Sequence, residues 1–227
     1  MLVPDLVQIP LMQKQGDVHV QVHYGTNGAT GSVAVSPLPN IAFLGSYSRA
    51  LSKGDRALNG NLNDLTHGHE LTEAEVGGYL PSLPLSGQNL TIELYGGMMV
   101  GTVRGGLGFS GLNSNIQIVD AKARQVFVKL NMGLREVFTI QRVNSASEQP
   151  SVQILEWGSC FKFSNWQLTD FTYDGVIAPG EKQEGNYLQT SIFARWPGRF
   201  LFWEFQTGIL YPVSNNSNRP NIASLCA

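Results

Sequence analysis

The sequence has little charge, few cysteines and no long apolar run. Asp, Glu, Lys and Arg make up 14% of its 227 residues, whereas about 25% is usual for soluble domains. The formal net charge is −2 and the pI is about 6.1, so nothing favours nucleic acid as a partner. No apolar stretch approaches the roughly 18–20 residues of a membrane helix, but alternating membrane strands are not excluded by this.

Cysteine and leader signals are equally sparse. Cys160 and Cys226 have no metal-site spacing, so we interpret them as separate thiols, with a disulfide as the alternative. The first four residues lack the basic start and apolar core of a cleavable signal peptide. If the protein leaves the cytoplasm, we therefore expect a mature form or one whose leader has been removed.

The most informative stretch runs from Leu90 to Arg104, LTIELYGGMMVGTVR. Every second residue from Leu90 to Val100 is apolar or Gly, whereas the other face carries Thr91, Glu93 and several glycines. A period of two predicts a β-strand. The run exceeds the usual strand length of about 5–6 residues and suits a tilted membrane strand, which needs about 9–11.

Alternation of this kind recurs along the chain. Residues 1–15 have no clear period and are predicted to form an extended strap, followed by a single β-barrel domain over 16–227. We expect about ten strands, with eight as the alternative, at 16–24, 32–38, 41–51, 69–80, 90–104, 124–136, 152–167, 187–196, 199–212 and 221–227. Long polar loops are predicted at 52–68, 105–123 and 171–186, whereas the connections on the other side are mostly short. The fold class is therefore all-β, a single up-and-down antiparallel transmembrane barrel with this loop asymmetry.

The ionisable strand residues fall on the face opposite the aliphatic side chains. We predict that they point into the lumen and form an ion-pair network that plugs it, because unpaired buried charges are very costly. The set is Glu73, Glu75, Glu93, Lys129, Arg135, Glu156, Lys162, Arg195 and Glu204. The alternative is a soluble ligand-binding β-barrel with the aliphatic face inside and these charges in water.

Large aromatic residues gather on the aliphatic face in the C-terminal half. They are Trp157, Phe161, Phe163, Trp196, Trp203 and Phe205. Such residues form girdles at the two bilayer interfaces of membrane barrels. We therefore predict that these six side chains face lipid.

Several segments, taken in order, resemble a family of small Bacteroidota-type outer-membrane β-barrel proteins of unassigned function. They are VPDLVQIPLMQKQGD, GTNGAT, NIAFLGSYS, HGHELTEAEVGGYL, IELYGGMMVGT and GILYP. The sequence departs from the family in lacking an N-terminal lipoprotein cysteine, and Glu75-Val76 interrupts its Gly-rich rhythm. The resemblance implies a location and a shape, and it implies no catalytic residues.

Two chemical alternatives concern the end of the first long loop. His67, His69 and Glu70 have the residue types of a surface zinc site, but we favour a solvated loop end. A rim protease would use Asp64 with these histidines and an opposing acidic pair, for which only Asp170 and Asp174 are available. We expect no enzyme activity, no metal and no cofactor.

The sequence thus predicts a non-enzymatic integral barrel in the outer membrane of a Gram-negative bacterium, with both termini periplasmic. Its partners would be outer-membrane lipid and other outer-membrane proteins of a complex. It would act through its long surface loops or as an accessory or structural subunit. The first alternative function is a narrow channel for ions or small solutes, and the second is the soluble ligand-binding barrel.

Overall fold

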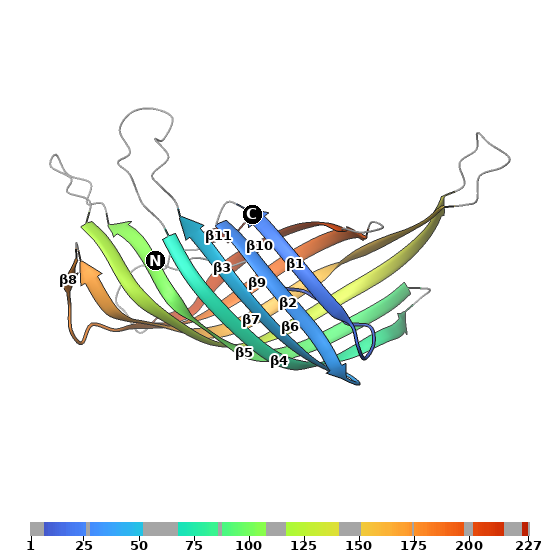
Figure 1. Cartoon of the computed structure of the whole chain (residues 1–227), viewed down its shortest axis with the longest axis horizontal. Coiled ribbons are helices and arrows are strands. Elements are labelled where there is room, and N and C mark those ends of the chain that lie inside the picture. Colours follow the sequence, from blue (N-terminus) through green and yellow to red (C-terminus); the bar gives the residue numbers. More distant parts are fainter. Residues whose placement is uncertain are drawn as a thin grey trace, which may run out of the picture.

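Nearly all described residues of the chain lie in long, strongly tilted β-strands (Figure 1). The computed structural model describes residues 7–25, 28–51, 68–85, 88–107, 117–140, 151–173, 175–197, 202–215 and 224–226. The strands are β1 Val18–Gly25, β2 Gly28–Leu38, β3 Ile41–Leu51, β4 Gly68–Leu85, β5 Gln88–Leu107, β6 Gln117–Ile140, β7 Ser151–Tyr173, β8 Val176–Ile177, β9 Gln183–Pro197, β10 Phe202–Asn215 and β11 Ser224–Cys226. Within this part of the chain, no helix is long and apolar enough to cross a membrane.

The strands form one antiparallel up-and-down sheet. Its order is β1-β2-β3-β4-β5-β6-β7-β9-β10-β11, and the two-residue β8 pairs only with β7. This path has the ten strands that the sequence predicts. The sheet is strongly curled (Figure 1), which confirms the predicted barrel-like meander. The ladders of the described residues end at β1 on one side and β11 on the other.

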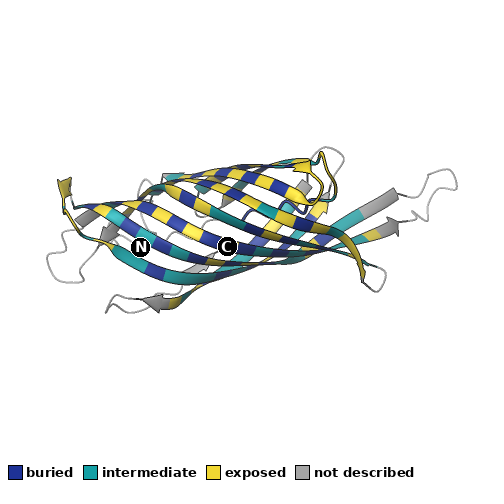
Figure 2. Ribbon diagram, turned by 90° about the horizontal axis from the view of Figure 1, so that it is seen from below, coloured by how far each residue is buried: buried dark blue, intermediate teal, exposed yellow. Residues whose placement is uncertain are grey.

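Burial alternates along the strands with the period that the sequence predicts (Figure 2). On β5, Thr91, Glu93 and Tyr95 are buried, whereas Leu94 and Met98 are exposed. Side chains of successive strand residues point to opposite faces. The buried face is the inner, concave one, because the interior ion pairs described below join side chains of strands that are not neighbours.

Several connections are shorter than the sequence analysis predicts, because the strands run farther into them. Much of the predicted 105–123 loop is strand, since β5 continues to Leu107 and β6 begins at Gln117. The predicted 171–186 loop contains the end of β7, all of β8 and the start of β9. On 117–123 the apolar residues Ala121 and Ala123 are on the inner face and Lys122 is on the outer face. This alternation is weak and has the opposite phase, so the sequence pattern favours a loop where the structure has a strand.

The described part of the predicted N-terminal strap lies inside the curled sheet. Val7 and the next five residues are all buried. The chain then reverses direction at Gly16, whose φ of 88° favours glycine, and whose N–H donates to Ser36 O at 2.7 Å. Asp17 Oδ2 accepts hydrogen bonds from the N–H groups of Gln13 and Lys14. The strap is therefore folded back into the lumen from the start of β1, and this position was not predicted.

Candidate functional site

Two lysine–glutamate pairs occupy the middle of the lumen. Lys129 Nζ lies 2.6 Å from Glu75 Oε1, and both side chains are completely buried. Lys162 Nζ lies 2.6 Å from Glu73 Oε2, and these side chains are also buried. The first pair joins β4 to β6 and the second joins β4 to β7, so the contacts cross the concave face of the sheet.

The geometry of the wall makes room for these pairs. Glu75, Gly97 and Phe127 lie side by side in register on β4, β5 and β6. A Cβ at Gly97 would be 2.7 Å from Phe127 Cζ and 3.0 Å from Glu75 Cγ. Glycine at this position lets the Glu75 side chain cross β5 and reach Lys129, which is a close approach that a larger residue would block.

Aromatic rings cover the same two lysines. Lys129 Nζ lies 4.9 Å from the centroid of the Tyr95 ring, and Lys162 Nζ lies 3.8 Å from that of Phe127. A cation over a ring face is attracted by the ring quadrupole, most strongly where water is excluded. Each lysine is thus held by a carboxylate and by an aromatic face.

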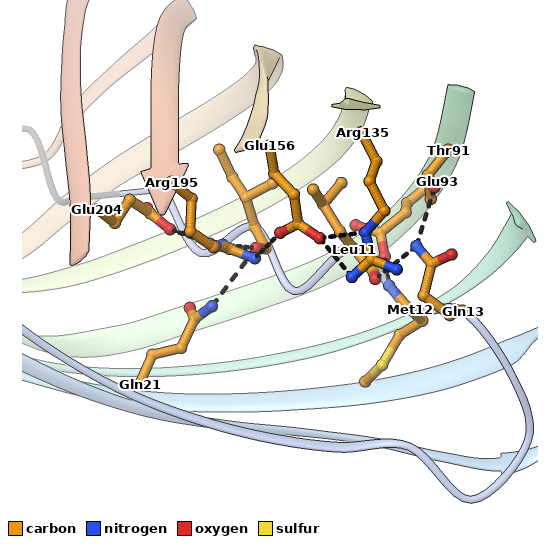
Figure 3. Close-up of polar contacts among 11 residues, drawn as sticks. Leu11, Met12, Gln13, Gln21, Thr91, Glu93, Arg135, Glu156, Arg195 and Glu204 are labelled. Atoms are coloured by element: carbon orange, nitrogen blue, oxygen red, sulfur yellow. Dashed lines mark hydrogen bonds and ion pairs between the residues drawn. The ribbon is translucent and has the colours of Figure 1, made fainter. Parts of the chain in front are cut away.

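A second group of charges forms a chain of ion pairs across β6, β7, β9 and β10 (Figure 3). Arg135 Nε donates to Glu156 Oε1 at 2.8 Å. Arg195 lies between two carboxylates, with Nη1 3.4 Å from Glu156 Oε2 and Nη2 2.6 Å from Glu204 Oε2. The two arginines and two glutamates balance in charge. The side chains of Arg195, Glu156 and Glu204 are buried, and that of Arg135 at the end of the chain of pairs is 35% exposed. Buried charges are tolerated when they are paired in this way.

Glu93 is the fully buried carboxylate that binds the strap (Figure 3). Its Oε1 accepts a hydrogen bond from the main-chain N–H of Met12 at 2.7 Å. Its Oε2 accepts one from Asn131 Nδ2 at 2.9 Å. Tyr95 Oη donates to Oε1 at a longer 3.3 Å. Neutral donors, including one from the strap, therefore satisfy Glu93.

The lumen side chains also hold the strap through its carbonyl groups. Lys129 Nζ donates to Gln8 O at 2.9 Å. Arg195 Nη2 donates to Ile9 O at 2.5 Å, and Gln21 Nε2 donates to the same oxygen at 3.4 Å. The Ile9 carbonyl thus connects β1 with β9, which lie near opposite ends of the strand order.

Apolar side chains of the strap are buried against the wall. Val7, Ile9 and Leu11 form a cluster with Cys160 and Phe193. A separate cluster contains Met12 together with Ala34, Ala42, Leu44, Tyr79 and Tyr95. At Gly133 an added Cβ would lie 2.6 Å from Leu11 Cδ2, so the Leu11 side chain occupies the space left by that glycine.

The nine ionisable residues predicted for the lumen all lie on the inner face. Eight of them are in the ion pairs described above, and Glu93 has the neutral partners instead. The six predicted aromatic residues, Trp157, Phe161, Phe163, Trp196, Trp203 and Phe205, are all exposed on the outer face.

The described residues do not form the zinc site or the rim protease site that were considered as alternatives at the end of the first long loop. His69 is buried on the inner face, whereas its neighbour Glu70 is exposed and accepts a hydrogen bond from Tyr47 Oη. Asp170 is exposed and pairs with Lys122 at 2.8 Å. Asp64, His67 and Asp174 lie outside the described residues. Among the described residues, no group of three or more His, Cys, Asp or Glu could hold a metal ion.

Sequence reasoning missed the strap as a set of lumen ligands. A usable signal was present, because residues 7–12 contain four large apolar side chains, and Pro10 makes the segment a poor paired strand. Such a segment must bury those side chains against something other than a sheet partner. The main-chain contacts with Lys129 and Arg195 have no sequence signal, because carbonyl groups are the same in every residue.

Comparison with known proteins gives no match to a family model, a curated protein or a solved structure. The chemical interpretation therefore depends on the geometry itself. A lumen lined by balanced charges and occupied by a main-chain-bound strap is suited to excluding solutes and to holding an extended peptide.

Proposed function

We propose that the protein is a non-enzymatic integral β-barrel of a Gram-negative outer membrane, with a lumen closed by the strap and the ion pairs. The observation that carries the proposal is an inversion of polarity along the outer face of β6. Asp120, Lys122 and Arg124 come first on this face, and Glu136 follows at the other end. Between them the outward residues are Val126, Val128, Leu130, Met132 and Leu134.

The inner face of the same strand changes in the opposite sense. Ala121 and Ala123 are buried beside the charged outer residues. Lys129 and Asn131 are buried beside the apolar outer residues. The first arrangement is that of a protein surface in water, and the second is that of a barrel in lipid. One strand with both arrangements supports a water–lipid boundary near Arg124.

The length of the apolar segment fits a bilayer. Arg124 and Glu136 are twelve residues apart, or about 41 Å along a strand that rises about 3.4 Å per residue. At the tilt of about 35–45° that is usual for membrane barrels, this corresponds to about 29–34 Å of height. The hydrocarbon core of a bilayer is about 30 Å thick.

The region beyond this boundary supports the same orientation. On the outer face Arg104 Nε lies 2.6 Å from Asp120 Oδ1, and Lys122 pairs with Asp170. On the inner face an apolar cluster extends from Phe127, inside the apolar segment, into this region. Its other members are Leu71, Met99, Val103, Ala121, Ala123, Trp166, Leu168 and Phe171. Charges outside and a hydrophobic core inside are expected where a barrel wall continues into water.

The outer tryptophans support the second boundary. Trp196 and Trp203 are register partners on β9 and β10. Trp157 Nε1 donates to Glu136 Oε1 at 3.4 Å, next to the charged end of the β6 segment. Indole rings favour the interface because they combine an apolar body with a polar N–H.

A closed lumen leaves the outer surface and the loops as the parts that meet other molecules. We therefore propose a role in surface contact or as an accessory or structural subunit, with outer-membrane lipid and other outer-membrane proteins as partners. The family resemblance of the sequence is consistent with this location.

Quenching of tryptophan fluorescence by brominated lipids tests the lipid-facing assignment. The Trp166→Phe variant keeps Trp157, Trp196 and Trp203. We expect brominated acyl chains to quench the tryptophan fluorescence of this variant strongly in lipid vesicles. The matched variant with these three residues changed to Phe keeps only the buried Trp166 and should be quenched much less. Equal quenching of the two variants would contradict the proposed faces. A chain that stays in solution without detergent, with the same gel migration boiled and unboiled, would contradict the membrane barrel.

Conductance across planar bilayers tests closure. The inserted wild-type chain should give no steady open current, because buried pairs and the strap fill the lumen. A steady open current would favour the alternative of a narrow ion or solute channel.

A further inference from the structure

The contacts of the strap are those of a bound peptide. Three of its hydrogen bonds to the lumen use main-chain atoms, the carbonyl oxygens of Gln8 and Ile9 and the N–H of Met12. Pro10, which has no N–H to satisfy, lies fully buried between them. One buried bond uses a side chain, from Ser32 Oγ to Gln8 Oε1 at 2.6 Å. Main-chain recognition with separate apolar contacts for side chains is how proteins bind extended peptides in general.

The lumen groups that bind the strap are strongly buried. Glu93 and Lys129 have no exposed surface, and Arg195 is 2% exposed. These exposures are for the lumen with the strap in place. If the strap left, each group would lose the hydrogen bond that it makes to the strap, and another donor or acceptor would have to replace it. The lumen therefore favours an occupant with carbonyl and N–H groups at the spacing of the strap.

The connection between strap and barrel is a turn with hydrogen bonds of its own, from Gly16 N–H to Ser36 O, from Gln15 Nε2 to Pro37 O and from Lys14 N–H to Asp17 Oδ2. Lys14, Gln15 and Gly16 are exposed, and they take no part in the contacts of residues 7–12 with the lumen that are described above. Leu11 has a φ of 52°, a left-handed conformation that is unfavourable for a bulky residue. Its side chain in the space at Gly133 and the Met12–Glu93 hydrogen bond hold the chain in this bend.

We propose that the lumen is a binding site for an extended apolar peptide, which the chain's own strap occupies. A peptide with the chemistry of residues 7–12 binds there in trans when the strap is released. The side chains of Lys129, Arg195 and Glu93 bind main-chain groups of the peptide. The wall contacts its apolar side chains at the positions of Ile9, Leu11 and Met12. The proposal concerns the lumen alone and is independent of the membrane location, since binding can be measured in detergent.

The test cuts the strap after folding. A site-specific protease sequence is inserted in the exposed stretch Lys14 to Gly16, and the purified full chain is cleaved in detergent. A fluorescent synthetic peptide of residues 4–16 is then added, and its uptake is followed by anisotropy. We expect uptake by the cleaved chain and none by the uncleaved chain, with competition by unlabelled peptide. A competitor with Ile9→Asp and Leu11→Asp should be at least ten-fold weaker.

Failure of uptake by a cleaved chain from which the cut strap has been washed out, and which keeps its heat-modifiable gel migration, would overturn the proposal. Equal competition by the normal and the doubly changed peptide would also overturn it.

A complementary pair of substitutions tests the same contact in the intact chain, in case the cleaved barrel unfolds. Gly133→Val should lower the unfolding temperature, because its side chain takes the space of Leu11. Leu11→Gly in the same chain should then restore much of the loss. The control is Gly96→Val, at a glycine on the outer face. Adding Leu11→Gly to this variant should not restore its stability. Lack of rescue at Gly133 would show that the strap is not seated there, and would overturn the proposal.

Discussion

Replacing Lys129 by methionine should destabilise the protein by about 3–5 kcal/mol, which is the usual cost of removing one partner of a buried ion pair. The Glu75 carboxylate would remain buried without its cation, and the Gln8 carbonyl of the strap would lose its donor. Methionine has nearly the same length as the lysine stem, so the loss comes from charge and hydrogen bonding. Urea unfolding in detergent or vesicles measures the change.

A second substitution separates charge from packing. In the double variant Lys129→Met with Glu75→Gln, the buried unpaired charge is removed, and most of the stability should return. A residual loss of about 1–3 kcal/mol is expected, because Gln8 O still lacks its donor. If Glu75→Gln does not help, the cost of Lys129→Met lies in the strap contact and not in the ion pair.

The matched control is Lys122→Met on the same strand. Lys122 also pairs with a carboxylate, but its side chain and that of Asp170 are 69% and 60% exposed. Exposed pairs contribute about 0–1 kcal/mol. Equal effects of the two lysine substitutions would mean that water reaches the lumen freely, and the proposed closure would be wrong.

Alternation alone was sufficient to predict which strand residues face inward. Glu93 and Lys129 lie on regular strands in which every second residue is apolar, so the period of two defines their face. The pairing of charges could not be predicted in the same way. Glu73 on β4 contacts Lys162 on β7, and two strands lie between them. Such a contact depends on the curvature and tilt of the sheet, which the sequence pattern does not specify.

The ends of the strands were harder to predict than their middles. The phase of the alternation reverses near Arg124. Before this residue the outward side chains are charged and the inward ones apolar, whereas after it the outward ones are apolar and the inward ones are mostly polar. A reader who follows one apolar face loses the strand at this point and interprets residues 105–123 as a loop. The reversal was visible in the sequence, but it signals a strand only if the strand is expected to cross from one solvent into another.

Replacing Val128 by arginine should give the clearest answer about the solvent of the outer face. Val128 is 54% exposed and lies within the apolar segment of β6, next to its central outward residue Leu130. In water, a substitution at such a surface site usually changes stability by no more than about 0.5 kcal/mol. At the midplane of a bilayer, an arginine on the lipid face of a barrel costs about 2–4 kcal/mol. The two solvents therefore predict different results for one variant.

The control is Thr102→Arg on the outer face of β5, close to Arg104 and beyond the apolar segment. There the cost in a bilayer should be only about 0–1 kcal/mol, because a long side chain reaches the interface. The measurement is the free energy of unfolding by urea in lipid vesicles. If Val128→Arg and Thr102→Arg are equally neutral, the outer face is in water. If only Val128→Arg destabilises the protein, the polarity reversal on β6 is a membrane boundary, and the charges inside the barrel are there because lipid lies outside it.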